Sequence, residues 1–333
     1  MSATAAVTMD AADRRLLNLM QKDVPLVSRP FAEIGERLGM DEDEVLSRAR
    51  RLKEDGIIRQ ISAIFDSRRL GYSSTLVAMD IPEEIIEESA GRISEHAGVS
   101  HNYKRDNPFN LWFTLTLPPG IDLEAEVQRL AEEAKARRAR ILPALRLFKI
   151  GVELDLEQGT NTAEKRQLTK KAPDSFSEED LTYVRVLQQD LPLEPEPFRG
   201  WAESLGVSEE DMFARARDLE ECGVMRRFAA VIRHQRAGFT ANGMICWRIP
   251  EEKLPDLGHQ LAAYPQVSHC YQRPVYPDWP YSVFSMVHAL SREKCEEIAR
   301  QMSEEIGISD YAILYSTKEY KKERVKYYAG SGD

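Results

Sequence analysis

Two short runs of the sequence carry a histidine, a tyrosine and an arginine at alternate positions. The first row comprises His101, Tyr103 and Arg105, and the second row comprises His269, Tyr271 and Arg273. Histidine titrates near neutral pH and can donate a proton, and the planar guanidinium of arginine binds a carboxylate through two hydrogen bonds. Each row therefore combines groups that could transfer a proton and hold an anion.

Both rows lie in runs bounded by turn signals, residues 99–105 and 267–273, which predict β-strands. Alternate side chains of a strand point to the same face of its sheet. A face turned to the core would be apolar, so each row is expected to line a polar cavity or to meet solvent. The alternative is a solvated sheet face without function. The row occurs in both halves, which weakens that alternative. A duplication would, however, also copy a surface that has no function.

An internal repeat relates the two rows. Pro30-Phe31 reappears as Pro197-Phe198, so the offset is 167 residues (197 minus 30). The offset is 168 where it relates His101 to His269. A constant spacing of this kind predicts two copies of one unit, joined by a polar linker.

Each copy is expected to open with three helices and a strand, and to continue in the order β-α-β-β-α-β. In the first copy the helices are predicted over residues 10–21, 30–38 and 41–56, with a strand over 57–65. The following elements are predicted over residues 74–81 (strand), 82–96 (helix), 99–105 and 111–117 (strands), 121–138 (helix) and 144–152 (strand). Three helices with a small β-ribbon form a winged helix-turn-helix, and the second order is the ferredoxin-like unit. The predicted fold class is therefore α+β, as a tandem duplication of these two domains.

The predicted domains follow from the repeat. They are a winged helix-turn-helix at residues 8–66, a ferredoxin-like domain at 67–155, a linker at 156–175, a second winged helix-turn-helix at 176–233 and a second ferredoxin-like domain at 234–328. The copies differ in one turn, which is Asp106 to Phe109 in the first and the longer Pro274 to Pro280 in the second. The longer turn is rigid and aromatic, and could cover one edge of a cavity.

Composition narrows the class of protein. The formal net charge is -10, which argues against a free-standing DNA-binding protein without excluding a local basic patch. No apolar run is long enough for a membrane span, and the first residues lack the features of a signal peptide. None of the 4 cysteines lies in a CxxC pair, so neither a zinc site nor a disulfide framework is expected. A reduced, cytoplasmic protein is predicted.

The third helix of the first copy carries Arg48, Arg50 and Arg51, which have a DNA-binding interpretation because this is the recognition helix of the motif. The alternative is that these arginines pair with the acidic residues at 41–44 and 54. In the second copy several acidic residues lie close to the corresponding arginines, which disfavours DNA binding by that helix.

The layout of a winged helix followed by a ferredoxin-like domain resembles that of the AsnC/Lrp regulators. Within it, His101 to Arg105, Leu145 to Val152 and Leu314 to Lys322 are similar to the siroheme decarboxylase family. That family usually has two related subunits, and the resemblance implies that both lie in this chain, over residues 1 to about 155 and over the remainder. It implies removal of the two acetate carboxyls on rings C and D of siroheme. The product would be didecarboxysiroheme, an intermediate towards heme d1 or, by an alternative route, heme b.

The resemblance implies a flat, iron-bearing substrate ringed by carboxylates. We expect a histidine of either row to protonate the carbon that loses carbon dioxide, a row tyrosine to position a carboxylate or relay a proton, and the row arginines to hold a neighbouring carboxylate. Lys318, Lys322 and Arg324 alternate in sequence and are expected to form a second cationic row beside the pocket. Trp112 and Trp279 lie near the expected cavity, with core packing as the alternative.

No cofactor beyond siroheme is expected, because the conjugated macrocycle can absorb the electron density that decarboxylation leaves. A bound heme is compatible with this site, and no protein-held metal is predicted. An axial ligand to the substrate iron could be among the remaining histidines, but nothing in their spacing singles one out. These are His96, His234, His259 and His288.

Three functions remain open from the sequence. The leading one is a carboxy-lyase acting on siroheme, with siroheme and didecarboxysiroheme as its partners. The alternatives are a fused AsnC/Lrp-type regulator that binds DNA and a small effector, and a non-catalytic tetrapyrrole-binding protein. DNA and membranes are not expected as partners, and a homodimer formed through sheet faces is compatible with the fold. The sequence does not determine which half holds the productive site.

Overall fold

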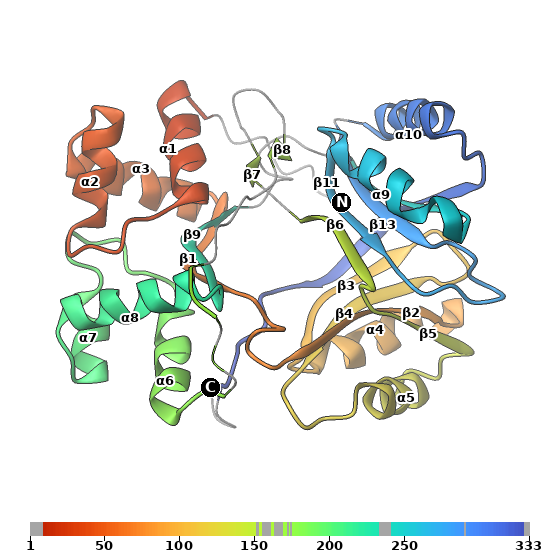
Figure 1. Cartoon of the computed structure of the whole chain (residues 1–333), viewed down its shortest axis with the longest axis horizontal. Helices are drawn as coiled ribbons and strands as arrows, with labels where there is room; N and C mark the ends of the chain where they lie inside the picture. Colours follow the sequence, from red (N-terminus) through yellow and green to blue (C-terminus); the bar gives the residue numbers. More distant parts are fainter. Residues whose placement is uncertain are drawn as a thin grey trace.

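The computed structural model describes residues 9–150, 153–154, 161–162, 169–171, 173, 175–232, 241–289 and 291–329. These residues form two lobes (Figure 1). One lobe contains both helix-turn-helix units, and the other contains a nine-stranded sheet with its helices. Most of the predicted linker, residues 156–175, lies outside the described residues.

The helix-turn-helix lobe contains two copies of three helices followed by one strand. They are α1 (Ala11–Lys22), α2 (Pro30–Leu38), α3 (Glu42–Glu54) and β1 (Ile58–Phe65), then α6 (Glu178–Leu187), α7 (Arg199–Leu205), α8 (Glu209–Glu221) and β9 (Met225–Ile232). Asp10 and Ser177 occupy equivalent positions, and each forms a capping box at the start of its helix. Gly39 and Gly206 end α2 and α7 with φ of 70°, a conformation that glycine adopts without strain. Local sequence signals therefore set these helix ends in both copies.

The β-ribbon of this lobe is shared between the copies rather than formed in each. β1 pairs antiparallel with β9, and one apolar cluster runs through both units. Each copy contributes a single strand here, whose backbone N–H and C=O groups need a partner. The equivalent strand of the other copy supplies that partner and joins the two units into one body.

The second lobe confirms the α+β fold class and its duplication. The first half contributes β2 (Ser73–Asp80), α4 (Ile86–Glu95), β3 (Val99–Arg105), β4 (Leu111–Leu117), α5 (Leu123–Glu133), β5 (Arg138–Leu142) and β6 (Arg146–Ile150). The second half contributes β10 (Ala241–Trp247), α9 (Leu254–Ala263), β11 (Val267–Gln272), β12 (Val283–Ala289), α10 (Arg292–Ile306) and β13 (Tyr311–Lys322). The strand order is β5-β2-β4-β3-β13-β10-β12-β11-β6.

The strand predicted over residues 144–152 is present as β6, and residues 151–152 lie outside the described residues. A further strand, β5, which is not predicted from the sequence, ends just before Pro143. Proline has no backbone N–H to donate and interrupts a strand. The helix predicted to reach residue 138 ends at Glu133, and Lys135 just beyond it has a positive φ of 52°. Residues 138–142, predicted as the end of that helix, form β5.

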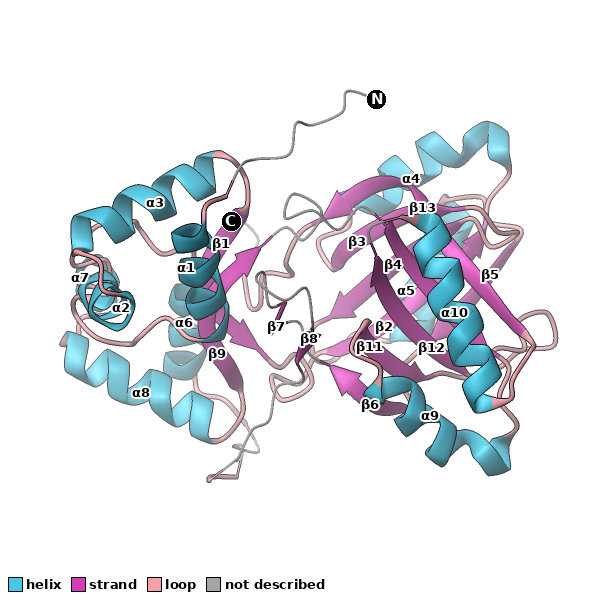
Figure 2. Cartoon of the chain, turned by 90° about the horizontal axis from the view of Figure 1, so that it is seen from above, coloured by secondary structure: helices cyan, strands magenta, loops and turns pink. Residues whose placement is uncertain are grey.

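The two halves exchange strands. β6 leaves the first half and pairs with β11 of the second. β13 pairs with β10 through its first residues and continues along β3 of the first half. Two short strands, β7 (Glu153–Leu154) just before the predicted linker and β8 (Asn161–Thr162) within it, pair with each other and lie beside α1 and β11, between the lobes (Figure 2). Each half therefore completes the sheet of the other.

The sheet curls until its two edges come close together. β5 and β6 lie at opposite edges, which in a flat sheet would be about 38 Å apart. Only residues 143–145 join them, a connection that spans at most about 14 Å. The rings of Trp112 and Phe284, four strand positions apart in the sheet, are separated by only 6.5 Å. The strands thus enclose an inner face, and the helices cover the outside (Figure 2).

Separate apolar clusters lie on the two faces of the sheet. The outer clusters pack the strands against α4 and α5 in the first half and against α9 and α10 in the second. The inner cluster contains Ala78, Phe109, Trp112, Leu142, Met244, Cys246, Trp279, Phe284 and Leu314. Among the described helices, none combines the length and apolar character needed to cross a bilayer.

The strand exchange can be tested at Gly258 of α9. A methyl group there would overlap the ring of Phe148, which β6 brings from the first half, whereas a methyl group at Gly91, a glycine of α4 in the first half, meets open space. We expect Gly258→Ala to lower the free energy of unfolding by about 1–3 kcal/mol through overpacking. Gly91→Ala, the matched control, should raise it by about 0.5–1 kcal/mol, because alanine is the better helix former. Urea unfolding of both variants measures the difference, and equal effects would contradict the packing of Phe148 on α9.

Candidate active site

A β-bulge turns each row towards the inner face. The pairing of β3 with β4 shifts register between Val99 and His101, and the pairing of β11 with β12 shifts between Val267 and His269. A bulge adds one residue to a strand and so changes which side chains share a face. Both valines accordingly pack in the outer clusters, while the histidines two residues later point to the opposite face.

The members of each row lie along one face, as the sequence predicts. In the first row the rings of His101 and Tyr103 are 6.2 Å apart, and the guanidinium carbon of Arg105 is 5.9 Å from the Tyr103 ring. In the second row the histidine and tyrosine rings are also 6.2 Å apart, and the guanidinium lies 5.1 Å from the tyrosine ring. Both rows therefore present the same three groups in the same order.

The row arginines are held inside the curled sheet. Arg105 Nη1 donates to the carbonyl oxygen of Leu314 at 2.9 Å, and Arg273 Nη1 donates to the carbonyl oxygen of Leu142. The Nε atoms of both arginines are buried and have no hydrogen-bond partner among the described residues. Burial lowers the pKa of both guanidiniums, that of Arg273 to about 10. Buried guanidiniums with unused donors favour an anion as their partner.

The inner ends of the two rows converge. Cys246 of β10 lies in the inner cluster between them, and burial raises the pKa of its thiol above the usual range. Arg105 and Arg273 both oppose this increase in pKa, so both guanidiniums lie within electrostatic reach of the same sulfur. The two arginines therefore approach one region of the inner face from the two halves.

The histidine end of the first row faces the helix-turn-helix lobe. Arg59 of β1 donates to the backbone oxygen of Lys322 at 2.8 Å, and Arg324 Nη1 donates to Ser62 Oγ at 2.9 Å. Burial, followed by the positive charges of Lys322 and Arg59, lowers the pKa of His101 to about 4. The neutral form of His101 therefore predominates at pH 7, and negative charge placed on these two cations would favour its protonation.

The second row also faces cations from the helix-turn-helix lobe and its connection. Burial raises the pKa of Tyr271, and Arg273, Arg226 and Arg68 oppose that increase. Arg226 lies on β9, at the position equivalent to Arg59 on β1, and Arg68 follows β1. Each row thus has an arginine from the shared ribbon in its electrostatic environment.

The two rows differ in their cross-strand neighbours. Along the first row, Glu319 lies opposite the tyrosine and Lys322 opposite the histidine. Along the second row, the equivalent neighbours are Leu147 and Ile150. Burial, and after it the negative charge of Glu319 and a hydrogen bond to it, raises the pKa of Tyr103. The cross-strand neighbours of the first row are therefore charged, and those of the second row are apolar.

Lys318 does not join the second cationic row predicted with Lys322 and Arg324. The register of β13 against β3 shifts between Glu319 and Lys321, so the simple alternation from Lys318 to Lys322 is interrupted. Lys318 pairs with Glu87 of α4 on the outer face, whereas Lys322 lies opposite the first-row histidine. The prediction of one continuous row is wrong for this reason.

Trp112 and Trp279 are packed together in the inner cluster. Their rings are 5.2 Å apart, and their exposed fractions are 1% and 3%. Trp112 Nε1 donates to the carbonyl oxygen of Phe109 at 2.5 Å. Burial of both indoles favours the packing alternative over direct contact with a substrate.

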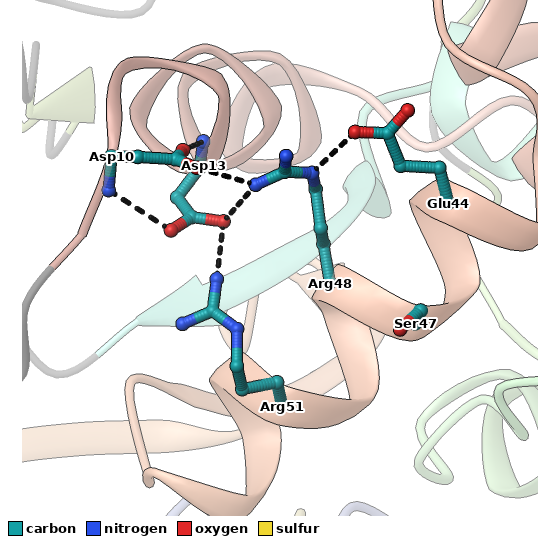
Figure 3. A pocket seen from close by; sticks show the side chains of 6 residues that line it. All are labelled: Asp10, Asp13, Glu44, Ser47, Arg48 and Arg51. Atoms are coloured by element: carbon teal, nitrogen blue, oxygen red, sulfur yellow. Dashed lines mark hydrogen bonds and ion pairs between the residues drawn. The ribbon is translucent and has the colours of Figure 1, made fainter.

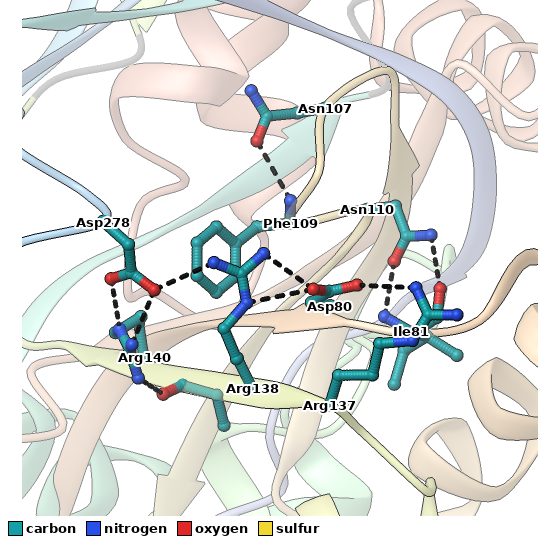
Figure 4. Close-up of polar contacts among 10 residues, drawn as sticks. Asp80, Ile81, Asn107, Phe109, Asn110, Arg137, Arg138, Arg140 and Asp278 are labelled. Atoms are coloured by element: carbon teal, nitrogen blue, oxygen red, sulfur yellow. Dashed lines mark hydrogen bonds and ion pairs between the residues drawn. The ribbon is translucent and has the colours of Figure 1, made fainter.

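The long turn of the second half packs Trp279 into the inner cluster and contacts the edge strand β5 through Asp278 (Figure 4). Asp278 accepts hydrogen bonds from Arg138 and Arg140 of β5 at 2.7–3.0 Å, and Arg138 also pairs with Asp80 at 2.7 Å. Tyr276 donates to the carbonyl oxygen of Ile141 at 2.7 Å. These contacts fix the turn of the second half across the edge strand of the first.

The pocket in Figure 3 lies in the helix-turn-helix lobe and contains no residue of either row. Arg48 lies 2.8 Å from Asp10, 3.0 Å from Asp13 and 2.9 Å from Glu44, and Arg51 lies 2.5 Å from Asp13. The alternative to DNA binding is therefore present in part: Glu44 pairs with Arg48 as predicted, whereas Asp10 and Asp13 at the start of α1 are not among the predicted partners. Arg50 Nη2 instead donates to the carbonyl oxygen of Leu193 at 2.6 Å. In the second copy the equivalent arginine pairs with the equivalent aspartate of α6.

The hollow expected beside the rows is not one of the two pockets described, since the second is lined by Lys170, Lys171, Pro173, Arg215, Asp218, Leu219 and Cys222. The role of the rows therefore stays a prediction. His234 lies outside the described residues, and His96 bonds to Glu126 at 3.0 Å. Within the described ranges, no group of three or more His, Cys, Asp or Glu side chains could hold a metal ion.

Sequence reasoning missed several polar residues around the rows. They are Arg59, Arg68 and Arg226, together with Glu319, Asn242 and the two serines Ser100 and Ser268 that hydrogen-bond Nδ1 of the row histidines. Two pairs among them carry a signal in the sequence: the arginines on β1 and β9 are related by the offset of 167, and the serines by 168. The others come together only through the folding of the sheet. His288 is predicted only as one of the possible axial ligands to the iron, not as a neighbour of a row.

Comparison with known families matches both kinds of domain. A model described as the AsnC-like ligand binding domain matches residues 69–149 and 236–321. A model described as the siroheme decarboxylase NirDL-like HTH domain matches residues 13–59 and 182–226. Both matches occur twice, in agreement with the internal repeat.

Full-length relatives are similar across nearly the whole chain. A siroheme decarboxylase of Hydrogenobacter thermophilus is 41% identical over 318 residues, which cover 95% of this chain and 94% of that protein. A crystal structure of the siroheme decarboxylase NirDL in co-complex with an iron-uroporphyrin III analogue has a TM-score of 0.74 and 35% identity, covering 96% of this chain and 95% of that chain. The siroheme decarboxylase beta subunit of Methanosarcina barkeri is 43% identical over 147 residues, 44% of this chain and 97% of that protein. This chain therefore combines in one polypeptide what such relatives divide between subunits.

The electrostatics of the first row can be tested at Lys322. Burial, and after it the charge of Lys322, lowers the pKa of His101 and that of His288 on β12 of the other half, each to about 4. We expect Lys322→Met to raise both pKa values, because it removes a positive charge that disfavours both imidazolium ions. Histidine NMR titration measures the change, and Lys318→Met on the outer face of the same strand is the control. An unchanged pKa of His288 in Lys322→Met would contradict the placement of Lys322 near this histidine.

Protonation of these histidines also affects stability. The unfolded chain takes up protons near the ordinary histidine pKa of 6.5, whereas the folded chain does so near 4. The free energy of unfolding should therefore decline as the pH falls from about 6.5 to 4. Lys322→Met should make this decline smaller than in the unaltered protein.

Proposed function

The chain belongs to the siroheme decarboxylase family, and we propose that it is a carboxy-lyase that removes the two acetate carboxyls on rings C and D of siroheme. The product is didecarboxysiroheme, which feeds the synthesis of heme d1 or an alternative route to heme b. The observation that carries the proposal is the pair of rows on the inner face. Each combines a histidine with a buried guanidinium that has unused donors, and the histidine of the first row faces the helix-turn-helix lobe.

The charges around the rows match a substrate ringed by carboxylates. The whole chain has a net charge of -10, yet cations gather around the rows from several elements. They are Arg59, Arg68, Arg226, Lys322 and Arg324. Arginine pairs with carboxylates bidentately, and burial strengthens such a pair because water competes less. A tetrapyrrole can therefore be held by its rim between the sheet and the β1–β9 ribbon.

The proposed reaction is balanced by one proton for each carboxyl removed. The bond between the acetate methylene and its carboxylate carbon breaks, carbon dioxide leaves, and the electron pair stays on the methylene carbon. The conjugated macrocycle of the substrate spreads this charge. A row histidine in its imidazolium form donates a proton to the methylene carbon, which becomes a methyl group. The histidine regains its proton from solvent before the second carboxyl leaves.

Carboxylate binding and proton supply are coupled at the first row. Lys322 and Arg59 oppose protonation of His101, so a substrate carboxylate paired with them raises the pKa of the histidine. The row tyrosines position the carboxylate or relay the proton. The proposal requires no organic cofactor beyond the macrocycle of siroheme itself, and cytoplasmic location stays a prediction.

The regulator alternative is not favoured. Arg48 and Arg51 on the recognition helix are occupied by carboxylates of the same chain. A DNA-binding protein needs such cations for phosphate contacts. The remaining alternative, a non-catalytic tetrapyrrole-binding protein, differs from the proposal only in the absence of product.

Anaerobic incubation with siroheme, followed by mass spectrometry, tests the reaction. We expect two successive losses of carbon dioxide from the substrate. An absorption change without a change of mass would favour the binding protein and contradict the enzyme. A gel shift at low salt is the companion measurement, and strong binding to duplex DNA would revive the regulator.

Replacement of the row histidines tests the proposed proton donor. We expect His101→Ala, His269→Ala or both to lower kcat by roughly 10²–10⁴-fold, the usual contribution of general acid catalysis. KM should change less, because the guanidiniums that hold the carboxylates remain. Release of carbon dioxide under saturating siroheme gives the rates. If both variants turn over normally, neither histidine is the donor.

A further inference from the structure

A chain of three hydrogen bonds reaches the second-row histidine from β10 and β12. Asn242 Oδ1 lies 2.6 Å from His288 Nδ1, His288 Nε2 lies 2.7 Å from Ser268 Oγ, and Ser268 Oγ lies 2.9 Å from His269 Nδ1. Asn242 and His288 are direct cross-strand partners, so the sheet itself sets their distance. The chain begins at the Asn242 amide and ends on His269, one of the two candidate proton donors.

The direction of these hydrogen bonds follows from the chemistry of the first group. An amide oxygen can only accept, so His288 Nδ1 carries the hydrogen. Burial and the charge of Lys322 keep His288 neutral, so its Nε2 accepts the single hydrogen of the Ser268 hydroxyl. The Ser268 oxygen also lies 3.4 Å from the carbonyl oxygen of Met286, a longer contact that competes poorly for that hydrogen. Towards His269, the serine oxygen then acts as acceptor, and His269 Nδ1 carries a hydrogen.

The first half lacks this chain at the equivalent positions. Ser74 and Thr116 occupy the places of Asn242 and His288, and they bond to each other at 2.9 Å. Ser100 lies 3.0 Å from Nδ1 of His101. A serine hydroxyl without a fixed acceptor elsewhere can either donate to that nitrogen or accept from it. The hydrogen bonds therefore determine one tautomer for His269 and leave both open for His101.

We propose that Asn242 and His288 are positioning residues for catalysis, which act through Ser268 to hold His269 with hydrogen on Nδ1, so that Nε2 exchanges the proton with the substrate. This inference rests on the proposed decarboxylation. When the imidazolium form of His269 gives the Nε2 proton to the methylene carbon, the neutral ring that remains is the tautomer that the chain of hydrogen bonds stabilises. No hydrogen bond in the chain has to reverse during the transfer. The second row is then the site at which protonation is prepared.

The chain itself offers the matched variant for a test. Asn242→Ser combined with His288→Thr gives the second half the residues that the first half already accommodates in the same sheet positions. Ser268→Ala cuts the same chain of hydrogen bonds by removing one oxygen and serves as the second variant. Full-length protein labelled with ¹⁵N-histidine reports the tautomers in long-range ¹H–¹⁵N spectra, with His269→Gln to assign the signal.

We expect the unaltered protein to show His269 protonated at Nδ1 and both variants to show a mixture of tautomers. With siroheme, kcat should fall about ten- to hundredfold while KM stays within about twofold, because a positioning residue affects proton transfer more than binding. A wild-type signal for the Nε2–H tautomer, or variants with an unchanged tautomer, would overturn the proposal. A changed tautomer with unchanged kcat would overturn the catalytic role.

The failure of the proposed function is distinguishable from these outcomes. If the unaltered protein leaves the mass of siroheme unchanged, the decarboxylase proposal falls and the catalytic role of the network falls with it. The tautomer measurement needs no substrate and still decides whether Asn242 and His288 orient the ring.

Discussion

Backbone pairing between the two halves is the interaction on which the rest of this structure depends. β13 runs from the sheet of the second half along β3 of the first, and β6 runs from the first half along β11 of the second. Each of these pairs satisfies a strand edge that would otherwise expose its N–H and C=O groups. The pairing also brings Lys322 and Glu319 to the first row. Neither half could assemble the surroundings of its row alone, and a single polypeptide keeps both halves at high effective concentration.

Duplication has preserved the scaffold and changed the inner face. Helix caps, bulges and both rows recur at offsets of 167 or 168 residues. The cross-strand neighbours of the rows do not recur, because charged residues in one half correspond to leucine and isoleucine in the other. Side chains on the inner face can diverge without disturbing the strands, since strand pairing uses the backbone and outer packing uses the opposite face. Two similar frameworks can therefore carry out different parts of one reaction.

The helix-turn-helix lobe has the shape of a DNA-binding motif, and two arginines of its recognition helix are paired with carboxylates of the same chain. Its recognition helix still carries basic residues, but Arg48 and Arg51 form ion pairs with Asp10, Asp13 and Glu44 within the lobe. Asp13 is nearly buried, and a buried carboxylate needs its partners to stay charged. What the lobe contributes instead is the β1–β9 ribbon, whose Arg59 and Arg226 act on the two rows. The motif thus places two arginines of the ribbon, Arg59 and Arg226, beside the rows of the sheet.

The sequence by itself determined the repeat, the type and order of most elements, the two rows and the family resemblance. These depend on local properties: capping residues, glycines with positive φ, alternation along a strand and a constant offset between copies. It did not determine that β5 and β6 would separate at Pro143, that the ribbon would be shared, or that Lys318 would leave the row of Lys322 and Arg324. It also left open which polar groups would surround the row histidines.

Only the tertiary structure decided these points, because each depends on which strands pair and in what register. A bulge of one residue moves a side chain from one face to the other, and nothing local in the run from Lys318 to Arg324 signals it. The network from Asn242 to His269 joins three strands that are distant in sequence. The periodicity of a sequence predicts which side chains of one strand share a face. Which side chains of different strands come into contact depends on the pairing and curvature of the whole sheet.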